Sequence, residues 1–312
     1  MHLSELCGDS NIDAIIAHLR QVAPLEPVPV ASSSEGAAGE ETAAATDHSN
    51  IHGLWGYRDN DGRTAFHWAL ALKNFDLARK LMQAPYNAPV LTEDEGWSTP
   101  FATACTVGTP LDLLSEILDR SVTAFTALME QKEAEQSSTS ELQNSGGADL
   151  VDPVQGSKDG GPEKLLFGMS GISKPADSTP ASITTVLVNA EDATGQTPLL
   201  LAVGRGHLNV VRFLLERGAD LMHQNRRGES SLHRAVSRGH MDLVEFLVST
   251  SEKNNATNKA VHRRWMNLRD KHGESALFYA STDNNEEIGR YLLRHGADRE
   301  LRNADGKAFW DV

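Results

Sequence analysis

The sequence predicts an all-α solenoid of about seven helix-turn-helix units with β-turn fingers, interrupted by insertions that we expect to be disordered. The first observation is a glycine-containing motif that recurs every 33 or 34 residues, in the pairs Gly62/Gly96, Gly195/Gly228 and Gly273/Gly306. The second is the apolar spacing near 3.6 residues that follows the motif, as in 208–215 and 241–248. Together they indicate one helix pair per period.

The repeated motif explains how each unit begins. The motif recurs in four stretches, 61–69, 194–202, 227–235 and 272–280. In each, a glycine is followed by a polar residue, then by Thr or Ser, then by Leu or Phe two places later, and the stretch ends in Ala. Glycine permits the positive φ of a tight turn, and the hydroxyl can cap the helix that follows. A β-turn followed by two helices with this period is typical of the ankyrin repeat. The sequence therefore predicts an ankyrin-repeat solenoid.

Counting units along the chain gives seven. The first, from Leu3 to Leu19, lacks its turn and is interpreted as a cap with 11–16 as its second helix. The other units are expected to begin near Asp59, Asp94, Asp192, Asn225, Asp270 and Ala304. In the third unit, Trp97-Ser98-Thr99-Pro100 has one residue more than the usual Gly-x-Thr-Pro spacing. The seventh is predicted to be a stub, because the sequence ends at Val312.

Insertions are expected between these units. The organisation predicted is a capping repeat at 1–24, a disordered insertion at 25–53, repeats two and three at 54–119, a long and mostly disordered insertion at 120–185, repeats four and five at 186–249, a short insertion at 250–264, and repeats six and seven at 265–312. The long insertion is expected to start as a lengthened helix from Val122 to Glu135. Low apolar content in the rest of it, and in 25–53, favours disorder.

Composition excludes several classes of function. The net charge of −14 disfavours nucleic-acid binding, and no apolar run is long enough for a membrane span or a secretory signal. Cys7 and Cys105 are far apart, which indicates a reducing compartment and buried thiols. No arrangement of catalytic, phosphate-binding or metal-ligating residues is present, so we expect no enzyme activity, cofactor or metal. His67 and His233 are expected to bond the backbone of neighbouring turns.

Two tryptophans, Trp68 and Trp97, indicate a narrower group of ankyrin-repeat proteins. The motif at 61–69, the stretch Asp94–Ser98 and the stretch Leu232–Ala235 resemble the gankyrin-like proteasome assembly chaperones, of the proteasome non-ATPase regulatory subunit family. The resemblance implies a concave face that binds the C-terminal domain of a proteasome base ATPase subunit while the regulatory particle assembles. It implies a protein of the cytoplasm and nucleus. The family contact positions that match are Arg63, Trp68, Trp97 and Arg205.

Position in the repeat extends this set. Trp68, Thr103, Leu201, Arg234 and Tyr279 are equivalent places on the first helices, and Trp, Tyr and Arg dominate interface hot spots. The predicted partner-binding residues are Asp61, Arg63, Trp68, Asp94, Glu95, Trp97, Arg205, Arg226, Arg227, Arg234, Arg238 and Tyr279. Acidic turns in the early repeats and basic residues later predict a polarised groove. One alternative is a generic ankyrin scaffold that binds a kinase or transcription factor, because the fold alone does not identify the partner. A more remote alternative is an enzyme with its active site in the long insertion. We expect the free protein to be a monomer.

Overall fold

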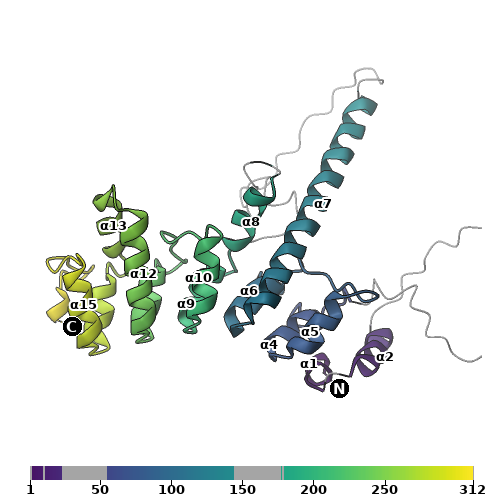
Figure 1. Cartoon of the computed structure of the whole chain (residues 1–312), viewed down its shortest axis with the longest axis horizontal. Helices are drawn as coiled ribbons and strands as arrows, with labels where there is room; N and C mark the ends of the chain where they lie inside the picture. The colour runs from purple at the N-terminus through teal and green to yellow at the C-terminus, as the bar shows by residue number, and fades with distance from the viewer. Residues whose placement is uncertain (1, 10, 23–54, 144–176, 178, 312) are drawn as a thin grey trace, which may run out of the picture.

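The structure, a computed structural model, is an elongated array of antiparallel helix pairs joined by tight turns (Figure 1), and it describes residues 2–9, 11–22, 55–143, 177 and 179–311. The pairs are α1 (Leu3–Gly8) with α2 (Ile12–Val22), α4 (Ala65–Ala71) with α5 (Phe75–Met82), α6 (Pro100–Val107) with α7 (Leu111–Gln143), α9 (Pro198–Gly204) with α10 (Leu208–Glu216), α11 (Ser231–Ser237) with α12 (Met241–Asn254), and α14 (Ala276–Thr282) with α15 (Glu286–Arg294). A short 3₁₀ helix, η2 (Phe309–Asp311), follows the last turn. The predicted all-α solenoid is confirmed.

Local sequence sets where the first helices begin. The Thr64 hydroxyl accepts the N–H of His67, and Thr99 and Thr197 cap α6 and α9 in the same way, each followed by Pro at the first helical position. The first helices then stack side by side, α4 against α1 and α6, and α11 against α9 and α14. A buried alanine recurs at the same place in each helix, namely Ala69, Ala104, Ala202, Ala235 and Ala280. Small side chains there let neighbouring helices approach closely.

Two additional helices were not foreseen. α8 (Pro180–Val188) follows the long α7, and α13 (Lys259–Met266) follows the long α12, both at the upper edge of the array in Figure 1. Each ends at an asparagine that joins it to the next repeat. Asn189 donates to Gly218 O at 2.9 Å and accepts from Asp220 N at 2.7 Å. Asn267 makes the equivalent bonds to the loop that follows α15, so the two insertions are built alike.

The three expected insertions are described by the structure to different extents. Residues 25–53 lie outside the described residues, as do 144–176 and 178 of the long insertion. Its predicted opening helix exists but is longer than expected, because α7 runs unbroken from Leu111 to Gln143. Most of 250–264 is helical, as the end of α12 and the start of α13. The last turn, expected near Ala304, starts at Asn303, because the Asn303 carboxamide closes it. None of the described helices is long and apolar enough to span a membrane.

Candidate protein-binding surface

The turns of repeats two to seven, which we call the finger row, share one internal construction. In the first of them the Asp59 carboxylate accepts the N–H groups of Asp61 at 3.0 Å and Arg63 at 2.9 Å. The residues that do the same in the later turns are Asp94, Asp192, Asn225, Asp270 and Asn303. Asp and Asn favour such turns because their short side chains reach the backbone two and four residues on. The finger row is therefore preformed.

Backbone hydrogen bonds connect each finger to the next. The five bonds run from Glu95 N to Asp61 O, Ala193 N to Gly96 O, Arg226 N to Thr194 O, Lys271 N to Arg227 O, and Ala304 N to His272 O, at 2.8–3.1 Å. Described fingers are thus held at a fixed spacing, and the long insertion between repeats three and four does not interrupt them. Side chains at the tips of the fingers are presented as one continuous line.

Trp97 occupies a place that glycine holds in the other fingers. Its φ is +60°, in the left-handed region where Gly62 (+72°) and Gly195 (+74°) also lie. The prediction that Gly96 is the turn glycine was wrong, and with it the extra residue in the third unit: counted from Asp94, this turn has the normal length. The Arg226 guanidinium lies 5.4 Å from the centre of the Trp97 ring. It reaches across the finger of repeat four, where a Cβ on Gly195 would lie 3.0 Å from Arg226 Cγ.

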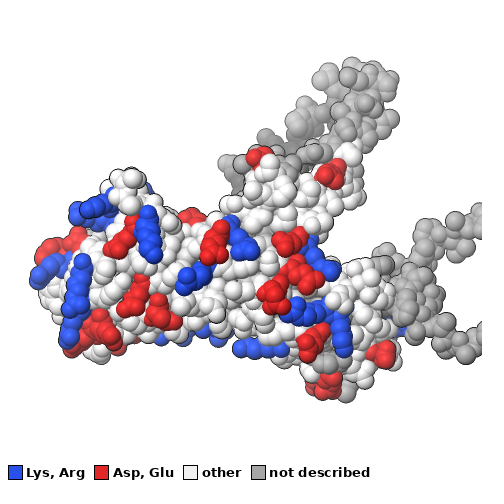
Figure 2. Space-filling view, in the orientation of Figure 1, with Lys and Arg blue, Asp and Glu red and all other residues white. Residues whose placement is uncertain are grey.

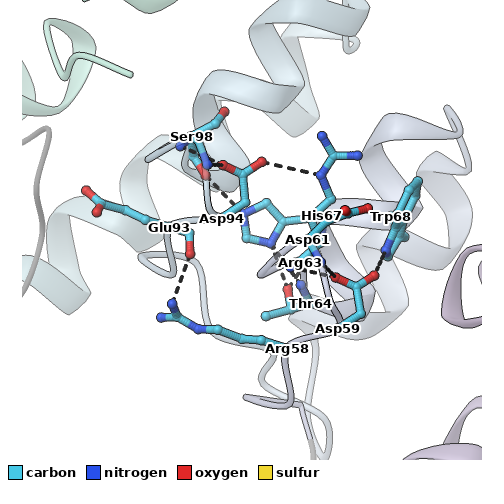
Figure 3. Close-up of polar contacts among 11 residues, drawn as sticks. Arg58, Asp59, Asp61, Arg63, Thr64, His67, Trp68, Glu93, Asp94 and Ser98 are labelled. Carbon is cyan, nitrogen blue, oxygen red and sulfur yellow. Dashed lines mark hydrogen bonds and ion pairs between the residues drawn. The ribbon is translucent and has the colours of Figure 1, made fainter. Parts of the chain in front are cut away.

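Trp68 lies on the first helix of repeat two and is half-buried against the core (Figure 3). Its indole Nε1 donates to the Asp59 carboxylate at 2.6 Å. Arg63 covers the ring at 4.9 Å and pairs through Nε with Asp94 at 3.3 Å. Asp59, which sequence reasoning missed as a site residue, therefore fixes the ring. Its motif position was visible, but its contact with Trp68 depends on the turn geometry.

The first-helix row behaves as one surface. Its five members, Trp68, Thr103, Leu201, Arg234 and Tyr279, are all half-buried. Tyr279 Oη donates to Asp270 at 3.1 Å, which repeats the Trp68–Asp59 contact four units later, and burial raises the pKa of this phenol. Arg234 donates to Gln196 at 2.8 Å and lies 3.6 Å from the Glu229 carboxylate. The side chains of Trp68, Arg234 and Tyr279 are held by their own or neighbouring fingers, so their orientation is set before any partner arrives.

The motif histidines join neighbouring repeats. His67 accepts the Thr64 N–H at Nδ1 and bonds Ser98 O through Nε2 at 3.3 Å. His233 makes the matching contacts with Ser230 and with Glu274 O at 3.1 Å. Burial lowers the pKa of His67 to about 4, so the ring is neutral at pH 7. Both rings therefore have a structural role, because they bond the backbone of neighbouring turns as the sequence predicted.

The predicted charges are placed unequally. Six of the charged residues in the predicted set are exposed: Asp61, Glu95, Arg205, Arg226, Arg227 and Arg238. By contrast, the Asp94 side chain is only 8% exposed, and its oxygens are taken by the turn and by Arg63. Asp94 therefore shapes the finger and offers little to a partner. On the face shown in Figure 2, acidic and basic side chains are interspersed along the array.

The remaining candidate chemistry is sparse. Cys7 and Cys105 are both buried, and burial raises the pKa of the Cys7 thiol to about 12, so neither is poised as a thiolate. Among the described residues, no group of three or more His, Cys, Asp or Glu side chains is placed to hold a metal.

Comparison with known proteins confirms the type of repeat. The family model for ankyrin repeats (3 copies) matches residues 176–259 and 221–303. A probable 26S proteasome regulatory subunit p28 of Saccharomyces cerevisiae is 26% identical over 179 residues, 51% of this chain and 72% of that protein. Ankyrin repeat and SAM domain-containing protein 6 of Mus musculus is 28% identical over 125 residues, 40% of this chain but only 9% of that protein. The predicted ankyrin-repeat solenoid is confirmed, and about half of the chain is similar to a proteasome regulatory subunit.

Proposed function

We propose that this protein is a non-enzymatic scaffold that holds the C-terminal domain of a proteasome base ATPase subunit while the regulatory particle assembles. The observation that carries the proposal is the prearranged finger row with its Trp97–Arg226 contact, flanked by the half-buried first-helix row. The similarity to the yeast proteasome regulatory subunit supports the choice of partner. Action in the cytoplasm and nucleus is part of the same proposal.

Preorganisation is what makes this surface suitable for binding. Association costs free energy for every side chain and loop that must be ordered, roughly 0.5–1.5 kcal/mol for each flexible side chain. Here the rings of Trp68 and Tyr279 are already fixed by Asp59 and Asp270. A partner that meets them therefore loses little of its binding energy to ordering, and half-buried aromatic rings are common anchors of interfaces.

Charge gives the surface a direction. The exposed carboxylates Asp61 and Glu95 lie on the fingers of repeats two and three, whereas Arg226 and Arg227 lie on that of repeat five. We propose that a basic patch of the partner faces the early repeats and an acidic patch faces repeats four and five. Complementary charge of this kind mainly speeds association and selects one orientation.

The partner is tested by purifying the tagged protein from its own cells and identifying bound proteins by mass spectrometry. Recovery of base ATPase subunits supports the proposal. Recovery of a kinase or transcription factor in their place would favour a general ankyrin scaffold, an alternative suggested by similarity to a protein with a different domain composition.

The surface is tested with purified partner by stopped-flow association. We expect Arg205→Glu with Arg238→Glu to slow association by about tenfold and to flatten its salt dependence. Both side chains are exposed at the ends of first helices, so folding should survive. Lys80→Glu, exposed on the second helix α5, is the control and should have little effect. An equal effect from the control would contradict the proposed face. Arg234 is unsuitable because it also supports the fold.

A further inference from the structure

A pocket of about 450 Å³ opens between α12, α13 and α15, away from the finger row and the first helices. Side chains of three helices line it, chiefly Glu252 and Asn255, Lys259 and Arg263, and Arg294 and His295. We propose that this pocket is a second protein-contact site, which binds an acidic peptide segment of a partner. One of its walls is α13, a helix for which repeats four and six have no counterpart.

The walls of the pocket are fixed in place. Trp265 anchors α13, since its ring is 1% exposed and its Nε1 donates to Leu221 O at 2.9 Å. Asn267 joins the end of α13 to the loop after α15 through Gly296 O and Asp298 N. His262 bridges Ser251 on α12 and His295 O on α15 at 3.0 and 3.2 Å. The three helices therefore hold the lining groups at set positions.

The charge of the pocket is opposite to that of the chain. Lys259, Arg263 and Arg294 are exposed, and none of them forms an ion pair with any residue that the structure describes. The single lining carboxylate, Glu252, accepts a hydrogen bond from His295 Nδ1 at 2.8 Å. With neutral histidines the lining sums to +2, three cations less one carboxylate. Basic side chains are seen around α13 in Figure 2.

These features fit a short carboxylate-rich peptide better than a nucleic acid. Charges in the pocket act over about 8 Å at physiological salt, so a few partner carboxylates bound there are largely screened from charges elsewhere on the surface. A nucleic-acid strand would extend beyond the patch onto a surface without a basic excess, since residues 186–312 hold 18 Lys and Arg against 17 Asp and Glu. Guanidinium groups also pair with carboxylates through two parallel hydrogen bonds, and this pocket offers two of them, Arg263 on α13 and Arg294 on α15.

The test uses the full chain and a dye-labelled peptide of alternating Glu and Gly, followed by fluorescence anisotropy. We expect the Glu peptide to bind at least about tenfold more tightly than a Gln/Gly peptide with the same dye, and more weakly as salt rises. Lys259→Glu with Arg263→Glu should remove this preference. Both residues are exposed, so the variant should keep its melting temperature.

A matched control is present on α12 and α13, two of the helices that line the pocket. Lys253 and Arg264 are exposed but do not line the pocket, so Lys253→Glu with Arg264→Glu changes the net charge equally. We expect this pair to retain the Glu-peptide affinity within about twofold, because exposed charges outside a contact contribute little. Equal weakening by the two pairs, or tighter binding of an oligothymidylate probe than of the Glu peptide, would overturn the proposal.

Discussion

The finger of repeat three tests whether the backbone or the ring decides the choice of residue at position 97. Trp97→Gly removes the strain of a residue with a Cβ in the left-handed region, which should raise the free energy of unfolding by roughly 1 kcal/mol. The lost contact with Arg226 costs roughly 0.5–1 kcal/mol, so the net change in unfolding free energy should be close to zero. Trp97→Ala loses the same contact without relieving the backbone. The Ala variant should therefore be less stable than the Gly variant by roughly 1 kcal/mol.

The measurement is urea unfolding followed by circular dichroism, with thermal melts as a check. For an array of this size, 1 kcal/mol corresponds to a shift of about 2–4 °C. Two glycine variants control the register. Gly228→Ala should be strongly destabilising, because φ is +81° and the new Cβ would lie 2.8 Å from Asp270 Cα. Gly96→Ala should be milder, since its nearest contact is the Asp94 carboxylate at 3.2 Å. An Ala variant at 97 as stable as the Gly variant, with Gly96→Ala as costly as Gly228→Ala, would refute the assigned turn.

Three further outcomes are expected. Trp68→Phe should lower the unfolding free energy by about 1 kcal/mol, because Asp59 loses its indole donor, and Asp59→Asn should change it less in the Phe background than in the wild type. The free energy of unfolding should fall between about pH 6.5 and pH 4, by up to about 3 kcal/mol from His67 alone. In this range the unfolded imidazole is protonated while the folded one, with a pKa of about 4, stays neutral. In urea melts, a His67→Gln variant should show a weaker dependence of stability on pH. Asn267→Ala should raise amide exchange in α13 while leaving α10 unchanged, and uniform exchange along the array would argue against a local clamp.

The repeat architecture could be predicted from the sequence because it depends on local rules. Turn glycines, hydroxyl caps and the 3.6-residue apolar spacing each act within a few residues, and their period identifies the stacking partner. The same local rules assign the positive-φ position of this turn to Gly96 and not to Trp97, where it lies. A glycine adjacent to the true position satisfies the pattern, and only the hydrogen bonds of Asp94 reveal the register.

Contacts between repeats were less predictable. Asp94 looked like an exposed finger-tip charge, but its carboxylate is enclosed by its own turn and by Arg63 from the preceding repeat. The helix α13 contains Lys259, Arg263 and Arg264 within eight residues, and only Trp265 and Met266 at its end are buried. Its position depends on the ring of Trp265 finding a backbone acceptor 44 residues away. Such long-range pairings have no signature in one sequence.

The contact between Arg226 and Trp97 has a consequence for cooperativity. In a solenoid each unit usually touches only its immediate neighbours, so stability is approximately a sum of unit and nearest-neighbour terms. This guanidinium connects repeat five directly to repeat three, over the glycine of repeat four. Loss of repeat four would therefore break two nearest-neighbour interfaces and a second-neighbour contact at once. The contact therefore adds to the coupling between the two halves of the array, which the long insertion separates in sequence.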